Sequence, residues 1–345
     1  MLFHNPSSPH ALGIKAERAM RDARKSIATA LCMCDKSTQL FSHASNEIIF
    51  TSGGTESNNL AILGYALANI RNSANLISFP YEHPSILAPI QFAQQQGWAD
   101  TKTNMPGAAL VSISHVNHET GDINDINAIS AEIKKKNPDA IIHVDGAQGF
   151  CKEKICLSGI DIYTFSGHKF HGPVGIGGLW VKKGIRLTPL QHGGGQEGGL
   201  RSGTENVSAI VQMAAAADTM SQNLAANHSK VAKIKEKLMS LQDALPNVVI
   251  NNLCQEVSPY ILNMSFLGVK GEILVHALSE KGVYVSMGAA CRSRKRAQPA
   301  LELMGFAPEI AQSAIRFSFS PHNTIEEAEQ VRDIVIKTVK QFRKL

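Results

Sequence analysis

Residues 140–145 read AIIHVD and residues 160–169 read IDIYTFSGHK, and these two runs decide the fold. Each opens with an apolar, β-branched stretch that is typical of a buried strand. The first then ends in a carboxylate, Asp145, and the second ends in Ser-Gly-His-Lys with Lys169 as its last residue. Because ligands bind at the carboxyl ends of strands in open parallel sheets, these two runs predict a ligand site there.

The same alternation of strand-like and helical patterns extends outward through the first two-thirds of the chain. The predicted strands are Glu47–Thr51, Asn75–Phe79, Ala109–Ser114, Ala140–Val144, Ile160–Phe165 and Gly178–Val181. The predicted helices between them are Glu56–Ile70, Pro84–Gln96 and Asp125–Lys136. Nearly continuous apolar strands separated by helices predict an α/β fold with a mainly parallel sheet flanked by helices.

The pattern changes after about residue 207, which predicts a second domain. The elements expected there are a long helical stretch (Ser208–Leu245), strands at Tyr260–Leu267, Val283–Ser286 and Ile315–Ser320, and helices at Gly271–Lys281 and Ile325–Phe342. We therefore expect a large α/β domain over residues 1–222 and a smaller C-terminal α+β domain over residues 223–345.

Composition excludes several classes of protein. Of the 345 residues, 43% are hydrophobic and 18% are charged, and no apolar run approaches the ~18 residues of a membrane helix. The start lacks the features of a secretory signal, so we expect a cytoplasmic protein with no membrane partner. The net charge of +5 is mild, and the basic clusters lack interleaved aromatics, which argues against nucleic acid as a binding partner. Six well-separated cysteines favour reduced thiols, with no metal site.

Four further features leave alternatives open. The run 51–57 (TSGGTES) is either a phosphate-binding helix start or a plain turn with Thr55 as N-cap. Asp145 either meets a cation or caps the next segment. Lys169 is either a desolvated amine suited to Schiff-base chemistry or a surface lysine. The glycine-dense residues 193–206 form either a flexible hinge or a rigid turn around a phosphate.

Together, these runs resemble the cysteine desulfurases of the NifS/IscS type, in the class V aminotransferase branch of fold-type I pyridoxal-phosphate enzymes. The resemblance runs from residues 5–8 (NPSS) to residues 314–318 (AIRFS), nearly the whole chain. It implies pyridoxal 5'-phosphate as cofactor, with Lys169 as the Schiff-base lysine, Asp145 as partner of the pyridine nitrogen and His83 stacked on the ring. The other cofactor contacts that it implies are Gln148 at the phenolic oxygen, the phosphate-binding Gly54, Thr55, Ser166 and His168, and Thr204 from the other subunit of a homodimer.

The resemblance also implies the reaction. Arg316 matches the arginine that pairs with the substrate carboxylate, for which its bidentate fork is suited. Cys291, in residues 286–291 (SMGAAC), matches the catalytic cysteine of the family loop, with Ala289 where the family has Ser. The implied activity removes sulfur from L-cysteine, giving alanine and a persulfide on Cys291. The sulfur would pass to an acceptor protein, an iron–sulfur scaffold or a thiolation enzyme. Two interpretations of the basic residues after Cys291 are open: they favour its thiolate, or solvent screens their charges and leaves the thiol pKa at the free-cysteine value.

The chain departs from the family pattern at three places. Nothing before Asn5 matches the N-terminal strand and Asp-Asn-Ala-Ala-Thr-Thr element of the family. A strand and loop are expected to be missing between Trp98 and Ala109, which would expose a sheet edge. His118 stands where the family has an asparagine that contacts the cofactor, and histidine still donates a hydrogen bond. Two alternatives therefore remain beside the desulfurase: a catalytically degenerate scaffold or binding protein, and a selenocysteine lyase-like enzyme.

Overall fold

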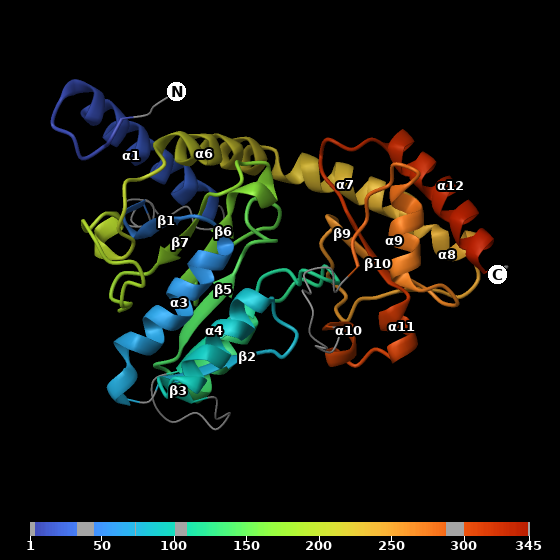
Figure 1. Ribbon diagram of the computed structural model, residues 1–345, viewed down its shortest axis with the longest axis horizontal. Helices are drawn as coiled ribbons and strands as arrows, with labels where there is room; N and C mark the ends of the chain where they lie inside the picture. The colour runs from blue at the N-terminus through green and yellow to red at the C-terminus, as the bar shows by residue number, and fades with distance from the viewer. Residues whose placement is uncertain (1–3, 33–44, 73, 101–108, 288–299, 344–345) are drawn as a thin grey trace. The chain divides into compact units, whose positions relative to one another are not determined.

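The structure is a computed structural model, and it describes residues 4–32, 45–72, 74–100, 109–287 and 300–343 (Figure 1). The chain divides into two compact units. The first unit comprises Met1–Val116 and Asn124–Leu224, and the second comprises Asn117–Ile123 and Ala225–Leu345. The short loop Asn117–Ile123 thus groups with the second unit, and the domain bounds expected from the sequence remain a prediction.

The first unit contains a seven-stranded sheet in the order β1-β7-β6-β5-β4-β2-β3. Its strands are β1 (Ile48–Thr51), β2 (Ala74–Ser78), β3 (Ala99–Asp100), β4 (Ala109–Ser114), β5 (Ile141–Asp145), β6 (Ile162–Ser166) and β7 (Gly177–Val181). The pairs from β3 across to β6 are parallel, whereas β7 pairs antiparallel with both β6 and β1. The prediction of a mainly parallel sheet is confirmed.

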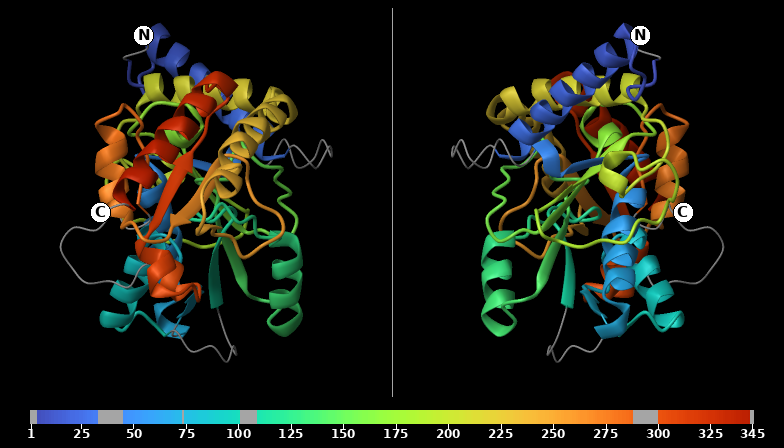
Figure 2. Two further views of the ribbon diagram at one scale, coloured as in Figure 1. Left: turned by 90° about the vertical axis from the view of Figure 1, so that its right-hand side faces the viewer. Right: turned by 90° about the vertical axis from the view of Figure 1, so that its left-hand side faces the viewer.

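Two layers of helices bury the two faces of this sheet (Figure 2). One layer contains α1 (Ala11–Leu31), α5 (Ile126–Lys136) and α6 (Val207–Gln222), and the other contains α3 (Gly54–Ala68) and α4 (Pro84–Gln95). Alternate residues of β6 show the division, because Ile162 packs with the α3 and α4 layer while Tyr163 and Phe165 pack with the opposite layer. Both faces of the sheet are therefore covered, as an apolar parallel sheet requires.

Three predictions about the elements of the chain are corrected. The helical stretch Ser208–Leu245 is broken into α6, α7 (Leu224–Met239) and α8 (Leu241–Ala244). The first break falls at Asn223, whose side-chain amide bonds the Thr219 carbonyl and competes with the helix. The predicted strand Val283–Ser286 is reduced to a single bridge between Ser286 and Arg316. The edge strand expected to be missing after Trp98 is present as the two-residue β3, which pairs parallel with β2.

The sequence analysis also missed one long element, the helix α1. Its buried residues recur every three or four positions, at Ala16, Met20, Ala23, Ile27 and Leu31, which is the spacing of an amphipathic helix. The side chain of His10 caps its first turn by accepting a hydrogen bond from the Gly13 amide. The α1 helix packs against α6 within the first unit.

The second unit is built on a three-stranded antiparallel sheet in the order β10-β9-β8. Its elements are β8 (Val248–Ile250), β9 (Ile261–Phe266), β10 (Ala314–Ser318) and the helices α7, α8, α9 (Gly271–Ser279), α10 (Ala300–Leu303), α11 (Pro308–Gln312) and α12 (Ile325–Phe342). The loop Asn117–Ile123 joins this unit because the Asp122 carboxylate accepts hydrogen bonds from the amides of Leu253 and Cys254. These bonds link residues far apart in sequence, so they could not be predicted from local sequence patterns.

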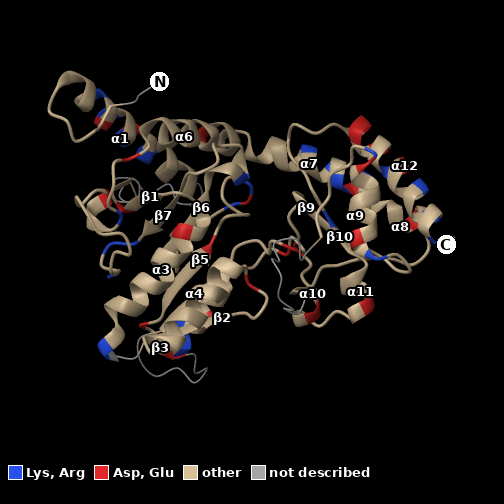
Figure 3. Ribbon diagram, in the orientation of Figure 1, with Lys and Arg blue, Asp and Glu red and all other residues tan. Residues whose placement is uncertain are grey.

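Figure 3 shows Lys and Arg interspersed with Asp and Glu over both units. Among the helices that the structure describes, none combines the length and the apolar character needed to cross a bilayer. Cys151, Cys156 and Cys254 are free thiols.

Candidate active site

Three strands of the first unit end at the same edge of the sheet and bring together the residues predicted for the site. The parallel strands β5 and β6 end at Asp145 and Ser166, and β5 pairs Asp145 with Thr164. Because β1 and β6 both pair antiparallel with β7, β1 runs in the same direction as β6 and ends here too. The α3 helix begins directly after β1, so its N-terminus, Asp145 and Ser166 lie at one edge.

The start of α3 is open to an anion. The N-cap residue is Gly53, and no side chain among the described residues caps this helix start. A Cβ on Gly177 would lie 2.7 Å from the Gly53 Cα, so only glycine lets the start of β7 approach this turn so closely. Ser166, which pairs with Gly177, is also close, because its Cβ would be 3.4 Å from a Cβ placed on Gly54. An uncapped helix N-terminus beside a serine hydroxyl suits a phosphate, and Thr55 stands in its first turn.

Lys169 lies in a short 3-10 helix, Gly167–Phe170, that follows β6. The fully buried Phe170 anchors this turn, and Lys169 itself is half-buried. The exposed His168 places Nδ1 3.2 Å from Ser166 Oγ. Burial lowers the pKa of His168, as do the positive charges of Lys169 and Lys152. Both lysines therefore lie close enough to His168 to oppose its protonation.

The Asp145 carboxylate is 7% exposed and is held by two donors. Its Oδ1 accepts a hydrogen bond from the Ala147 amide at 3.0 Å, and its Oδ2 accepts one from Asn58 Nδ2 at 2.9 Å. A buried carboxylate with these fixed contacts is oriented rather than mobile, and it can still pair with a cation at the strand end.

Gln148 follows in the same turn, and a buried lysine orients it. Lys152 Nζ donates to Gln148 Oε1 at 3.3 Å. Burial lowers the pKa of Lys152 to about 8, assisted by the positive charge of Lys169. The sequence analysis missed Lys152, because only the fold brings it toward Lys169.

His83 occupies the N-cap position of α4 and faces two residues that the sequence analysis also missed. Its Nδ1 accepts a hydrogen bond from the Ser85 amide at 3.1 Å and lies 2.7 Å from Ser85 Oγ. Ser85 Oγ in turn accepts a hydrogen bond from Asn58 Nδ2 at 2.8 Å. A surface hollow of about 760 Å³ adjoins these residues, and its lining includes Thr55, His83 and Ser85.

Glu82, next to His83, is a buried acid with an unusual proton affinity. Its Oε1 accepts hydrogen bonds from the amide and the hydroxyl of Ser114 at 3.0 and 3.4 Å. Its Oε2 is buried and has no hydrogen-bond partner in the part of the chain that the structure describes. Burial raises the pKa of Glu82 to about 7, and the nearby charge of Asp145 adds to this effect. Glu82 is therefore substantially protonated at neutral pH.

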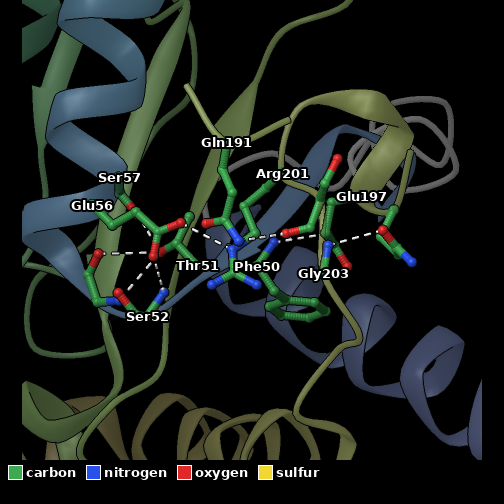
Figure 4. A network of polar contacts seen from close by, with 12 residues as sticks. Phe50, Thr51, Ser52, Glu56, Ser57, Gln191, Glu197, Arg201 and Gly203 are labelled. Atoms are coloured by element: carbon green, nitrogen blue, oxygen red, sulfur yellow. Dashed lines mark hydrogen bonds and ion pairs between the residues drawn. The ribbon is translucent and has the colours of Figure 1, made fainter. Parts of the chain in front are cut away.

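The second glycine-dense loop, residues 193–206, is tied to the phosphate turn by a polar network (Figure 4). Arg201 Nε donates to Glu56 Oε1 at 3.0 Å, and Glu56 Oε2 accepts from the Ser52 amide at 2.7 Å. Within the loop, the Gly203 amide donates to Gln196 Oε1 at 2.9 Å. These bonds favour the constrained turn over the flexible hinge. Thr204 is exposed at the end of this loop.

An ion pair supports the same loop from the other side. Arg24 of α1 lies 2.5 Å from Glu197, whose side chain is 1% exposed. The second carboxylate oxygen of Glu197 accepts a hydrogen bond from the Phe50 amide at 2.8 Å, as Figure 4 shows. Arg24 also donates to the Ile48 carbonyl at 2.5 Å and lies over the Phe50 ring. The loop is thereby fastened to β1.

Arg316 and His118 belong to the second unit. Arg316 Nη1 donates to the His118 carbonyl at 2.6 Å. Its Nε is buried, and no described group accepts a hydrogen bond from it. His118 Nε2 lies 3.6 Å from Glu119 Oε1. One nitrogen of the guanidinium is therefore anchored, and another is available to an acceptor.

Cys291 lies outside the described residues, as do residues 288–290 of its predicted loop. The structure therefore brings together Gly54, Thr55, Asp145, Ser166, His168 and Lys169 at one sheet edge, with Gln148 in the turn that follows β5. The roles predicted for these residues, and for His83, His118, Thr204, Arg316 and Cys291, remain predictions.

Comparison with known proteins gives a consistent result. The family model described as aminotransferase class-V matches residues 4–103 and 99–331. A NifS/IcsS protein homolog from Lactobacillus delbrueckii subsp. bulgaricus is 37% identical over 95% of this chain and 88% of its own length. Cysteine desulfurase IscS 1 from Archaeoglobus fulgidus is 31% identical over 99% of this chain and 91% of its own. A solved NifS-like protein has a TM-score of 0.87 at 31% identity, covering 99% of this chain and 92% of that structure.

Proposed function

The chain belongs to the aminotransferase class-V family and is similar along nearly its whole length to NifS/IscS cysteine desulfurases, and from this premise we propose that it uses pyridoxal phosphate to take sulfur from L-cysteine. The observation that carries the proposal is the pairing of two neighbouring strand ends. The parallel strands β5 and β6 place Asp145 and the Lys169 turn at the same edge of the sheet.

The residues at this edge fit pyridoxal phosphate. This cofactor has an anionic phosphate at one end and a ring nitrogen that is positively charged when protonated. The uncapped start of α3, with Thr55, Ser166 and His168 nearby, suits the phosphate. The oriented Asp145 carboxylate suits the protonated ring nitrogen. Lys169 would hold the cofactor covalently.

When bound, pyridoxal phosphate supplies an electron sink for the charge that develops when the substrate loses its α-proton. The residues of the chain supply the other requirements. Asp145 stabilises the positive ring nitrogen, and His83 would cover one face of the ring. Gln148, oriented by Lys152, would donate to the phenolic oxygen through its Nε2. Lys169, once displaced by the substrate amine, would carry the α-proton as general base.

Arg316 would bind the substrate carboxylate. Its Nη1 is fixed on the His118 carbonyl, and its buried Nε has no acceptor among the described residues. Because leaving a buried donor unsatisfied is costly, an incoming carboxylate would gain a strong, charge-assisted bond there. This geometry supports an α-amino acid as substrate.

Cys291 would accept the sulfur. Its thiolate attacks the sulfur atom of bound cysteine, the substrate C–S bond breaks, and the carbon retains the electron pair and is then protonated. The products are L-alanine and a persulfide on Cys291, which passes its outer sulfur to an acceptor protein for iron–sulfur cluster assembly or thiolation. A solved relative, titled SspA in complex with cysteine, has a TM-score of 0.76 at 28% identity, covering 93% of this chain and 92% of that structure. We further propose a cytoplasmic homodimer in which the exposed Thr204 completes the phosphate site of the partner.

The test measures alanine and sulfide formed from L-cysteine by the purified protein with added cofactor and a thiol reductant, which releases the outer persulfide sulfur as sulfide. Wild type should form both and should show the visible absorption band of a lysine-bound cofactor. Lys169→Ala should abolish the band, whereas Cys291→Ser should keep the band and lose sulfide release. Cys156→Ser is the matched control, because Cys156 is a free, half-buried thiol, and it should keep both.

The outcomes also separate the alternatives. A protein that stays colourless with excess cofactor would be a scaffold rather than an enzyme. A Cys291→Ser variant that retains full sulfide release would show that the nucleophile is assigned wrongly. Faster turnover of selenocysteine than of cysteine, retained in Cys291→Ser, would indicate a selenocysteine lyase.

A further inference from the structure

A continuous chain of hydrogen bonds connects His83 to Asp145 through two residues outside the family pattern described above. Asn58 lies in the second turn of α3 and Ser85 in the first turn of α4, with 1% and 6% of their surfaces exposed. Asn58 Nδ2 is 2.9 Å from Asp145 Oδ2 and 2.8 Å from Ser85 Oγ, and Ser85 Oγ is 2.7 Å from His83 Nδ1. Side chains of the neighbouring helices α3 and α4 (Figure 1) thus connect two residues with proposed roles at the cofactor ring. His83 is proposed to stack on the ring, and Asp145 is proposed to pair with its nitrogen.

The donors and acceptors in this chain can be assigned one by one. The Ser85 amide donates to His83 Nδ1 at 3.1 Å, so this ring nitrogen carries a lone pair and the imidazole proton is on Nε2. Asn58 Nδ2 has two hydrogens, and Asp145 and Ser85 accept one each. The hydroxyl hydrogen of Ser85 is then left for His83 Nδ1. The Ser85 amide and hydroxyl then share the one lone pair of His83 Nδ1.

The orientation of Asn58 is fixed by the carboxylate. Turning its amide over would place Oδ1 against Asp145 Oδ2, and two acceptors in contact repel each other. In the observed orientation Oδ1 is buried and has no hydrogen-bond partner within the described chain. Burying an amide oxygen without a partner costs free energy comparable to a hydrogen bond, and the charge-assisted bond to Asp145 offsets that cost. The unsatisfied oxygen indicates that contact with Asp145 takes precedence at this position.

We propose that Asn58 and Ser85 are positioning residues that orient the Asp145 carboxylate and hold His83 as the Nε2–H tautomer. The inference rests on the proposed function, because it gives His83 and Asp145 their roles against the cofactor ring. A protonated Nδ1 would have to give up the hydrogen bonds from the Ser85 amide and hydroxyl. The relay therefore presents a neutral imidazole with a donor at Nε2, while its other end presents a fixed acceptor to the ring nitrogen.

The experiment tests the two ends of the relay separately. At the His83 end, nitrogen-15 NMR of the apoprotein reports which ring nitrogen carries the proton, with the signal assigned by its loss in His83→Gln. Wild type and Ser85→Thr, which keeps the hydroxyl, should show the Nε2–H form. Ser85→Ala keeps the amide donor at 3.1 Å but removes the shorter hydroxyl contact at 2.7 Å, so part of the population should shift to the Nδ1–H tautomer, visible as a shift of the Nδ1 signal toward its protonated position.

At the Asp145 end, the measurements are the dissociation constant for pyridoxal phosphate and the pH dependence of its visible band. Asn58→Leu removes a hydrogen bond to a charged group and should weaken cofactor binding about 10- to 100-fold. The pH at which the visible band has changed by half should also differ from that of wild type. Asn75→Leu is the matched control. Asn75 is buried in the same unit but lies near the start of β2, whereas the site lies at the edge where the parallel strands end. It should keep wild-type affinity and spectrum even where it lowers stability.

Two results would overturn the proposal. One is a His83 tautomer in Ser85→Ala identical to that of wild type. The other is cofactor binding in Asn58→Leu as tight as in Asn75→Leu. If Asn58→Leu does not fold, the Ser85→Ala and Ser85→Thr pair decides the outcome. A wild-type protein that binds no cofactor would contradict the proposed function, whereas the tautomer measurement needs no cofactor and still tests the relay.

Discussion

Lys152 Nζ and Gln148 Oε1 are 3.3 Å apart on the turn that follows β5, so a buried ammonium fixes the direction of the Gln148 amide. Lys152 is 8% exposed, and burial, aided by the charge of Lys169, lowers its pKa to about 8. Each of the two ammonium groups opposes protonation of the other. Lys152 is therefore expected both to orient Gln148 and to keep Lys169 more readily available as a free amine.

Replacing Lys152 by Met should slow attachment of pyridoxal phosphate to the apoprotein below about pH 8. The reason is that the repulsion that favours the neutral amine of Lys169 is lost. The measurement is the rate at which the visible band appears, followed from pH 6 to pH 9. Lys154→Met is the control, because Lys154 is exposed two residues away, and it should behave as wild type. Equal rates in the two variants across this range would contradict the role given to Lys152.

Replacing Glu82 by Gln should flatten the pH dependence of stability. The folded-state pKa of Glu82 is about 7, above the ordinary value of 4.5, so the folded state binds its proton more tightly than the unfolded state. The stability this provides is complete below about pH 4.5 and is lost as pH rises through 7, by up to about 3 kcal/mol. Urea unfolding of wild type and variant between pH 5 and pH 8 measures the difference.

The comparison between wild type and Glu82→Gln is needed because other groups titrate in the opposite direction. Burial lowers the pKa of His115 and His143 to about 4, which makes stability rise between pH 4 and 6.5. These contributions are common to both proteins and cancel in the difference. If the stability of Glu82→Gln depends on pH as that of wild type does, the prediction that the pKa of Glu82 is raised in the folded state is wrong.

Replacing Gly146 by Ala should destabilise the first unit. A Cβ there would lie 2.1 Å from ring atoms of Tyr163, which is fully buried and hydrogen-bonded to His115 Nδ1 at 3.0 Å. The ring cannot move aside, so we expect a loss of about 3 kcal/mol or more, at the upper end for overpacking. Thermal unfolding gives the measurement. In the double variant with Tyr163→Leu, the loss should be smaller than the sum of the two single losses.

Replacing Glu197 by Gln should lower the free energy of unfolding by about 2–4 kcal/mol, because it leaves the partly buried Arg24 without its carboxylate. The Glu197 side chain is 1% exposed and that of Arg24 is 20% exposed. Glu17→Gln breaks the exposed pair between Glu17 and Arg21, with side chains 48% and 59% exposed, and should leave the free energy of unfolding nearly unchanged. Chemical unfolding compares the two, and similar losses would contradict the prediction.

The strand ends of the site could be predicted from the sequence because each signal is local. An apolar run followed by Asp145, and another followed by Ser166 to Lys169, needs only a few adjacent residues to be recognised. The helices α4 and α12 were likewise predicted nearly to their ends, since Pro84 and the Thr324 capping box mark where they begin.

The residues that hold the site could not be predicted in this way. Asn58 meets Asp145 across 87 residues of sequence, and nothing near Asn58 distinguishes it from a polar residue on a helix surface. The strand expected at Val283–Ser286 failed for the same reason. Its β-branched residues match a strand, but within the described parts of the chain only Ser286 forms a β-bridge, and Tyr284 is 84% exposed. The α1 helix did have a local signal, its three- and four-residue spacing, which was overlooked.

The ion pair of Arg24 and Glu197 has a consequence for how copies of this chain behave in a crowded solution. The strand β1 is at the edge of the sheet, where an incoming strand from another molecule could pair with its outward groups. The guanidinium already donates to the Ile48 carbonyl and the carboxylate already accepts from the Phe50 amide. Two side chains thus stand in for a neighbouring strand, and the edge offers little to which an aggregating chain could add.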